Sequence, residues 1–221
     1  MSLRKTLRDL LDQQRFDQIA ETAVQTRRTL GHLVSLTFDA DPRIGWGAVE
    51  AMGLAANRIA EDDPEYVRNH LRRLYWLLSE ESGGLCWRAP QAMAEIIRHR
   101  PTLFADFIPI VVHLIQQMAE EDLGHFRAGV LWAIARLGPL ANEHVKSVLP
   151  QITSALDDPD PQVRGLAVWC LQQVQQAELL TGRADLLIDD GPVDLYLNGH
   201  LDRTTVSALV RRALGREVQE A

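Results

Sequence analysis

The sequence predicts a mainly helical chain that is built from repeated pairs of helices and followed by a short β-hairpin. Apolar residues recur at helical spacing over residues 157–174, and the same pattern occurs about 37 residues earlier, over residues 126–137. Near the C-terminus, Asn198-Gly199 separates two short runs of β-prone residues. Asn-Gly between such runs is a strong local signal for a hairpin.

The helix predicted within residues 157–174 is the clearest copy of the repeat. Asp160 is a good N-cap, and Pro161 suits the first helical position. Its apolar stripe comprises Val163, Leu166, Ala167, Cys170, Leu171 and Val174. The copy before it has the stripe Phe126, Gly129, Val130, Ala133, Ile134 and Leu137, and Gly138-Pro139 ends that helix. Both copies place an arginine after the first stripe residue (Arg127, Arg164) and a tryptophan five residues later (Trp132, Trp169).

Two weaker copies precede these. Residues 87–94 lie 39 residues before the Phe126 copy, and residues 46–53 lie another 41 residues before that. Second helices are expected between the copies, at 64–78, 103–118 and 145–156. A period near 40 that is made of two helices indicates stacked helix pairs.

Residues 158–167, with the pattern Asp-Pro-x-Pro-x-Val-Arg-x-x-Ala, and the pair Phe126-Arg127 resemble HEAT repeats. The resemblance covers roughly residues 30–176 and is weaker in the first two copies, where Gly47 replaces the arginine. It implies a right-handed α-α superhelix of about four helix pairs. It also implies a capping segment at 1–26, repeats at 27–178, and a C-terminal hairpin and capping helix at 179–221. HEAT-like solenoids include protein scaffolds, nucleic-acid binders, DNA glycosylases and bilin lyases, so the fold alone fixes no activity.

Composition narrows the classes of partner and compartment. The chain has 221 residues, 46% hydrophobic residues and a net charge of −7, which disfavours the phosphate backbone of a nucleic acid as a partner. The two cysteines, Cys86 and Cys170, are expected to be free thiols in a reducing compartment. Because there is no long apolar run and no signal-peptide pattern, a cytoplasmic protein without a membrane span is expected.

Aromatic and acidic residues recur at one face of the first two copies. Trp46 and Glu50 are four residues apart, and Trp87, Gln91 and Glu95 continue the same spacing in the next copy. The loop before Trp87 is unusual because it combines two carboxylates with Gly83-Gly84. We therefore expect a groove that binds a protein or peptide partner through Trp46, Glu50, Glu80, Glu81, Trp87, Gln91 and Glu95.

Several alternatives stay open. Shifting the helical register by one residue restores apolar stripes in both weak copies, and the tryptophans and carboxylates then form only an outer flank. A HEAT-like DNA glycosylase could use Trp87, Glu95 and Arg127, although no motif of that family can be matched residue by residue. A bilin-lyase-like chaperone is a third possibility, and a second copy could dock at the β edge of the C-terminal piece.

We find no sequence pattern for a cofactor or metal. Neither Cys-x-x-Cys nor His-Glu-x-x-His occurs, and a single Glu95/His99 pair at helical spacing is common by chance. Cys86 is better explained as a small core residue than as a nucleophile paired with His99. The favoured interpretation is a scaffold without enzymatic activity.

Overall fold

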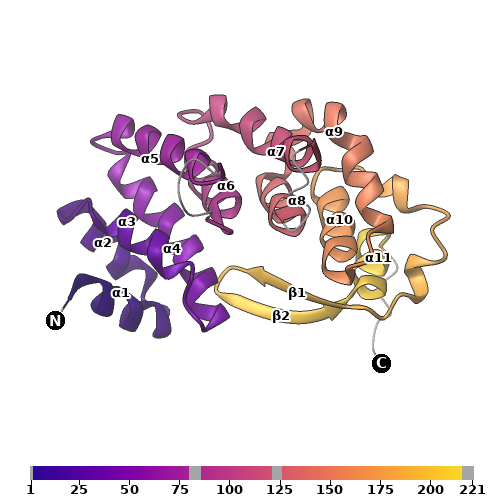
Figure 1. Cartoon of the computed structure of the whole chain (residues 1–221), viewed down its shortest axis with the longest axis horizontal. Helices are drawn as coiled ribbons and strands as arrows, with labels where there is room; N and C mark the ends of the chain where they lie inside the picture. The colour runs from indigo at the N-terminus through magenta and orange to yellow at the C-terminus, as the bar shows by residue number, and fades with distance from the viewer. Residues whose placement is uncertain (1, 80–85, 121–125, 216–221) are drawn as a thin grey trace. The chain divides into compact units, whose positions relative to one another are not determined.

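The computed structural model describes residues 2–79, 86–120 and 126–215, and most of them are helical (Figure 1). The helices are α1 (Leu3–Asp12), α2 (Phe16–Gln25), α3 (Thr29–Leu36), α4 (Pro42–Ile59), α5 (Pro64–Trp76), α6 (Ala89–His99), α7 (Ile108–Glu120), α8 (Arg127–Leu137), α9 (Asn142–Ser154), α10 (Pro161–Gln173) and α11 (Val206–Ala213). Two strands, β1 (Pro192–Leu197) and β2 (His200–Thr205), form one small sheet. The predicted class, a mainly helical repeat with a C-terminal hairpin, is confirmed.

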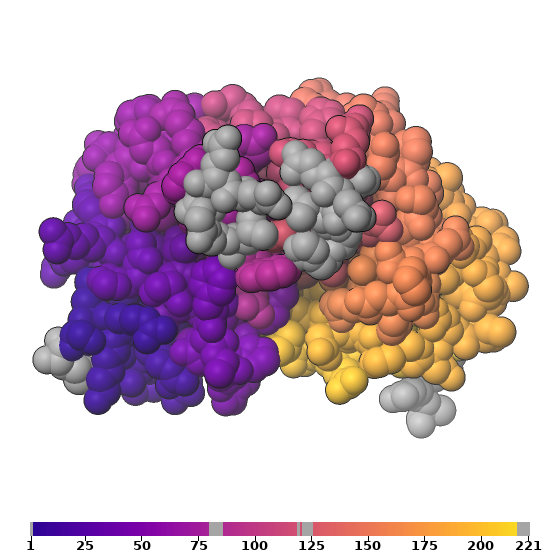
Figure 2. All heavy atoms as spheres, in the orientation of Figure 1, coloured from indigo at the N-terminus to yellow at the C-terminus, as the bar shows by residue number. Residues whose placement is uncertain are grey.

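The chain forms two compact units. The first contains the residues up to Phe107 together with the hairpin tip, Tyr196–His200, and the second contains the rest. In the first unit α4 packs against α2, α3 and α6, and α5 packs against α6. Helices α1 and α2 adjoin α4 in this unit, and their indigo surface lies beside its purple surface in Figure 2. In the second unit α8 packs against α7 and α10, and α7 against α9.

Aspartate-proline pairs start three of the helices. Asp41, Asp63 and Asp160 are the N-caps of α4, α5 and α10, and each is followed by proline. Each carboxylate accepts a hydrogen bond from a backbone N–H in the first turn of its helix. The predicted start of the clearest repeat is therefore correct, because an N-cap carboxylate satisfies an N–H that has no partner within the helix.

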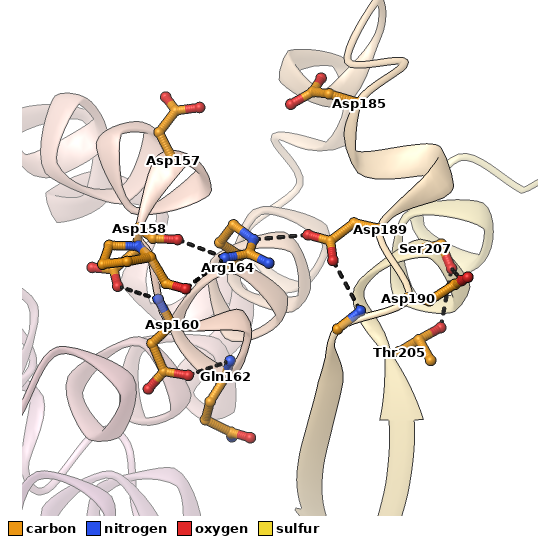
Figure 3. A network of polar contacts seen from close by, with 12 residues as sticks. Asp157, Asp158, Asp160, Gln162, Arg164, Asp185, Asp189, Asp190, Thr205 and Ser207 are labelled. Atoms are coloured by element: carbon orange, nitrogen blue, oxygen red, sulfur yellow. Dashed lines mark hydrogen bonds and ion pairs between the residues drawn. The ribbon is translucent and has the colours of Figure 1, made fainter.

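A second aspartate precedes the proline in a recurring turn. In Asp39-Ala-Asp-Pro42, Asp158-Pro-Asp-Pro161 and Asp189-Asp-Gly-Pro192, the first carboxylate accepts the backbone N–H two residues later. The other oxygen of the same carboxylate accepts a hydrogen bond from the guanidinium of an arginine in an earlier helix. The pairs are Arg8–Asp39 at 2.8 Å, Arg127–Asp158 at 2.7 Å and Arg164–Asp189 at 2.8 Å. Figure 3 shows Arg164 between the last two turns. The repeated pair ties each turn to a preceding helix.

Three local predictions differ from the structure. The apolar run at residues 184–188, which the sequence suggests as a further strand before the hairpin, contains only a 3₁₀ turn at Leu186–Ile188. Helix α7 begins at Ile108 rather than near 103, because Pro109 is favoured in the first turn of a helix. His113 lies in the nearly continuous apolar run of α7, which suggests a hydrogen-bonded core histidine, but the structure places it at the surface, hydrogen-bonded to Pro109 and Ser147.

The hairpin turn has the predicted form. Asn198 and Gly199 both have positive φ, 47° and 84°, as a two-residue type I′ turn requires.

None of the helices in the described part of the chain combines the length and apolar character needed to span a bilayer.

Candidate functional site

Four exposed aromatic side chains lie in the first unit. Phe38 follows α3, Tyr75 and Trp76 end α5, and Trp87 precedes α6. Their exposed fractions are 52%, 40%, 49% and 49%, and they are the exposed large aromatic residues of the described chain. We call these four residues the aromatic edge. Exposed apolar side chains mark interaction sites when they gather into one patch, whereas single ones are ordinary.

The chain segments that carry the aromatic edge meet at one junction. The Cys86 backbone N–H donates a hydrogen bond to the Leu77 carbonyl at 3.0 Å, which brings the end of α5 to the residue before Trp87. The Thr37 hydroxyl lies 3.9 Å from the Cys86 sulfur, and the Arg88 guanidinium donates to the Thr37 carbonyl. Three segments that are distant in sequence, each adjoining an exposed ring, are thus held together.

Trp46 adjoins this junction through Arg88 and is partly covered. Its ring stacks on the ring of Tyr196 in the hairpin tip, with centroids 5.3 Å apart and an interplanar angle of 6°. The Arg88 guanidinium lies 5.2 Å from the centroid of the Trp46 ring. Gly45 leaves room for Arg88, since a Cβ at that position would lie 3.0 Å from a guanidinium nitrogen. Burial lowers the pKa of Arg88 from its ordinary value.

Glu50 holds the hairpin tip on α4. One oxygen of its carboxylate accepts the Tyr196 hydroxyl and the Gly199 backbone N–H, each at 2.7 Å. The Gln14 side-chain amide donates to the Gly199 carbonyl at 2.8 Å. Burial and the neighbouring Glu50 carboxylate raise the pKa of Tyr196, so the phenol keeps its proton and acts as the donor. We call Trp46 and Glu50 the covered face.

The structure separates the residues that the sequence brought together. Trp87 is half exposed on the aromatic edge, whereas Trp46 and Glu50 contact the hairpin tip. Gln91 and Glu95 are buried, with exposed fractions of 5% and 1%, and Arg98 donates to the Glu95 carboxylate at 2.7 Å. These two residues are therefore not on the open surface of this structure. Glu80 and Glu81 lie outside the described residues.

Close packing between α4 and α6 explains why the polar residues of α6 are buried. Gly53 of α4 lies so near α6 that a Cβ there would be 2.8 Å from the Glu95 carbonyl oxygen. The residues of the shifted apolar register, such as Met52 and Met93, are fully buried. The register shift considered from the sequence therefore describes the core of these two helices.

Two of the three arginines of α5 are paired with carboxylates. Arg68 and Arg72 of α5 pair with Asp106 and Glu65, each at 2.7 Å. The acidic excess lies elsewhere, because residues 1–107 carry 14 Lys and Arg against 15 Asp and Glu, whereas residues 108–221 carry 9 against 15. The first unit therefore presents aromatic rings in a nearly neutral setting.

The thiols and carboxylates show no arrangement for covalent or metal chemistry in the described residues. Cys86 and Cys170 are buried free thiols, and burial raises the pKa of both, which favours the protonated, unreactive form. No group of three His, Cys, Asp or Glu residues among the described positions could hold a metal ion.

Comparison with known proteins supports the repeat class. Residues 124–174 match the family model of the HEAT-like repeat, which confirms the HEAT-type repeat predicted for this part of the chain. The chain is also similar to an uncharacterized protein of Archaeoglobus fulgidus, with 26% identity over 126 residues. That match spans 57% of this chain and 63% of the length of the relative. No solved structure matches the chain.

Sequence reasoning missed the role of Tyr196. The Asn-Gly signal located the hairpin correctly, but no local pattern pairs its tip with residues of α4. The contact joins residues that are 146 positions apart in the sequence. Only the folded chain reveals it.

Proposed function

We propose that this HEAT-like repeat chain is a non-enzymatic scaffold that binds a protein or peptide partner through the aromatic edge. The exposure of Phe38, Tyr75, Trp76 and Trp87 around one junction carries the proposal. Large, rigid aromatic side chains are enriched at the centres of protein interfaces, because they bury much area at a low cost in side-chain entropy.

The charges of the first unit favour a peptide over a nucleic acid. Binding to a phosphate backbone draws its affinity from Lys and Arg side chains that are free to replace counterions. On α5, Arg68 and Arg72 are already engaged by carboxylates. A partner segment with apolar and aromatic side chains requires no such cations.

The test is a selection of peptides from a displayed library on the whole protein, followed by calorimetric measurement of Kd. We expect Trp76→Ala and Trp87→Ala each to raise the Kd of the enriched peptides at least about tenfold, which corresponds to about 1.4 kcal/mol. Ile188→Ala is the matched control, because Ile188 is 79% exposed but lies in the second unit. Circular dichroism checks that each variant keeps its helices.

Two results would contradict the proposal. One is a set of enriched peptides whose Kd responds to Ile188→Ala as strongly as to Trp76→Ala and Trp87→Ala. The other is binding to a fluorescent DNA duplex that is tight at low salt and weakens steeply as the salt concentration rises, which would indicate a nucleic-acid-binding solenoid.

A further inference from the structure

Arg88 is a partly buried cation without a carboxylate partner in the described part of the chain. Burial lowers the pKa of its guanidinium, and no carboxylate of the described residues counters that effect. Its contacts are the hydrogen bond from Nη1 to the Thr37 carbonyl and the face of the Trp46 ring. A cation that loses water without gaining an anion costs free energy, so this charge is incompletely satisfied in the free protein.

One edge of the Arg88 guanidinium is still able to donate hydrogen bonds. Its Nη1 atom is used by Thr37, whereas Nε and Nη2 do not belong to the buried nitrogens that lack a partner, so solvent can reach them. Arg8 shows what this edge binds, because its Nε and Nη2 atoms donate to the two oxygens of Asp39, at 2.8 Å and 3.2 Å. The free edge of Arg88 has the same geometry and fits a carboxylate in the same way.

The start of α6 adds to the positive potential around Arg88. Helices α4, α5 and α10 each follow an aspartate whose side chain caps the first turn. Helix α6 has Arg88 itself at the N-cap position, with no side-chain cap and no acidic residue in its first turn. The N-terminus of a helix favours a negative charge. A cation therefore stands where the other helices carry their own carboxylate.

Arg88 also lies next to the aromatic edge. It follows Trp87 directly in the chain, and it is bonded to the carbonyl of Thr37, the residue before Phe38. An anion on the free edge of the guanidinium would therefore lie beside the segments that carry two of the exposed rings. Apolar side chains around an ion pair keep water away and strengthen the attraction between its charges.

We propose that Arg88 is the anion-recognition residue of the aromatic edge, and that the partner segment places a carboxylate on its Nε and Nη2 atoms, beside an aromatic or apolar side chain. This inference rests on the proposed function, whose partner it specifies as an acidic peptide. One guanidinium balances one carboxylate, whereas a phosphate monoester carries about 1.5–2 negative charges at pH 7. The neighbouring Arg68 and Arg72 are already paired with carboxylates, so the site offers a single unpaired charge.

The first test uses N-acetylphenylalanine, which combines a ring with a carboxylate, as the probe for the whole protein. NMR follows the Nε–H signal of Arg88 and the indole N–H signal of Trp87 during the titration. We expect both signals to shift and saturate, and the neutral N-acetylphenylalanine amide to bind at least about fivefold more weakly. Inorganic phosphate at the same concentration should shift the Arg88 signal less.

Three results of this titration would overturn the inference. They are equal affinity for the acid and the amide, a larger response of Arg88 to phosphate than to the acid, and no response of Arg88 to the acid. None of them depends on the natural partner, so each is separate from failure of the proposed function.

The second test uses the peptides that are selected on the whole protein. We expect aspartate or glutamate to recur in them, and replacement of this residue by its amide to raise the Kd at least about tenfold. On the Arg88→Met protein the acidic and amide peptides should differ by less than about twofold, because their difference is then no longer coupled to the guanidinium. Arg88→Gln serves as a second variant if circular dichroism shows that Arg88→Met does not fold.

Arg73→Met is the matched control for the loss of one positive charge. Arg73 is an exposed arginine near the end of α5, and its replacement should leave the tenfold difference between the two peptides in place. Peptides that depend on Trp76 and Trp87 but carry no acidic residue would refute the inference and leave the proposed function standing. A difference that persists in Arg88→Met, or that disappears equally in Arg73→Met, would refute it as well. If no peptide depends on the two tryptophans, the proposed function fails, and the titration with N-acetylphenylalanine still decides whether Arg88 binds a carboxylate.

Discussion

Replacing Gly53 by alanine tests the close packing of α4 on α6. A Cβ at this position would lie 2.8 Å from the Glu95 carbonyl oxygen and 3.0 Å from its carbonyl carbon, so the backbone of α6 would have to move. Overpacking of this kind costs about 1–3 kcal/mol. Alanine also stabilises a helix by about 1 kcal/mol relative to glycine, because of its higher helix propensity. We therefore expect a net loss of up to about 2 kcal/mol in the free energy of unfolding.

Gly31 in α3 provides the matched control. It is also a helical glycine, but a Cβ there would meet no atom within 4 Å. Gly31→Ala should therefore stabilise the protein by about 0.5–1 kcal/mol. Thermal unfolding followed by circular dichroism should show a Tm up to about 8 °C below that of the unaltered protein for Gly53→Ala, and a higher Tm for Gly31→Ala. If Gly53→Ala is as stable as Gly31→Ala, the helix packing described above is wrong.

Three further predictions concern buried and paired groups. Burial lowers the pKa of His70 from 6.5 to about 4, so the unfolded chain binds a proton at a higher pH than the folded chain does. About 3 kcal/mol of stability, fully present above pH 6.5, should therefore be lost as the pH falls towards 4. Denaturant titrations at pH 7 and pH 5 measure this loss, and it should shrink in His70→Leu. The hydrogen bond from Arg164 lowers the pKa of Asp189, so their pair stabilises the fold above the ordinary pKa of 3.8 and loses its effect as the pH falls through the folded-state value. Arg164→Met should cost about 1–2 kcal/mol at pH 7, and a cost that persists undiminished at pH 2 would show that the ion pair is not the cause. Burial should also keep Cys86 and Cys170 from reacting with a thiol reagent such as Ellman's reagent until denaturant is added, and rapid labelling of the native protein would contradict their placement.

The repeat could be read from the sequence because its signals are local. Asp160-Pro161 specifies a helix start through one side chain and one backbone N–H, and Asn198-Gly199 specifies a turn through two φ angles. Such signals act within a few residues of the chain, and no distant contact is needed to interpret them. The core register of α4 and α6 was also present in the sequence as one of two spacings that fit a helix.

The candidate site was less accessible to sequence reasoning. Whether Trp46 is covered and Trp87 exposed depends on which segments pack around the ends of α4 and α6, and those segments come from α3, α5 and the C-terminal hairpin. Tyr196 and Glu50 meet across 146 positions of sequence. The i, i+4 spacing places Trp87, Gln91 and Glu95 on one helical face, but it does not say whether a neighbouring helix or solvent covers that face.

Hydroxyl-radical footprinting of the tryptophans tests the central claim most directly, because it measures the accessibility of each indole in the folded protein. The account predicts rapid oxidation of Trp76 and Trp87, slow oxidation of Trp46, and protection of Trp132 and Trp169, whose exposed fractions are 1% and 5%. A bound peptide from the selection should protect Trp76 and Trp87. Indoles of the aromatic edge that are already protected in the free protein, or that oxidise equally fast when the peptide is bound, would contradict the claim that this edge receives a partner.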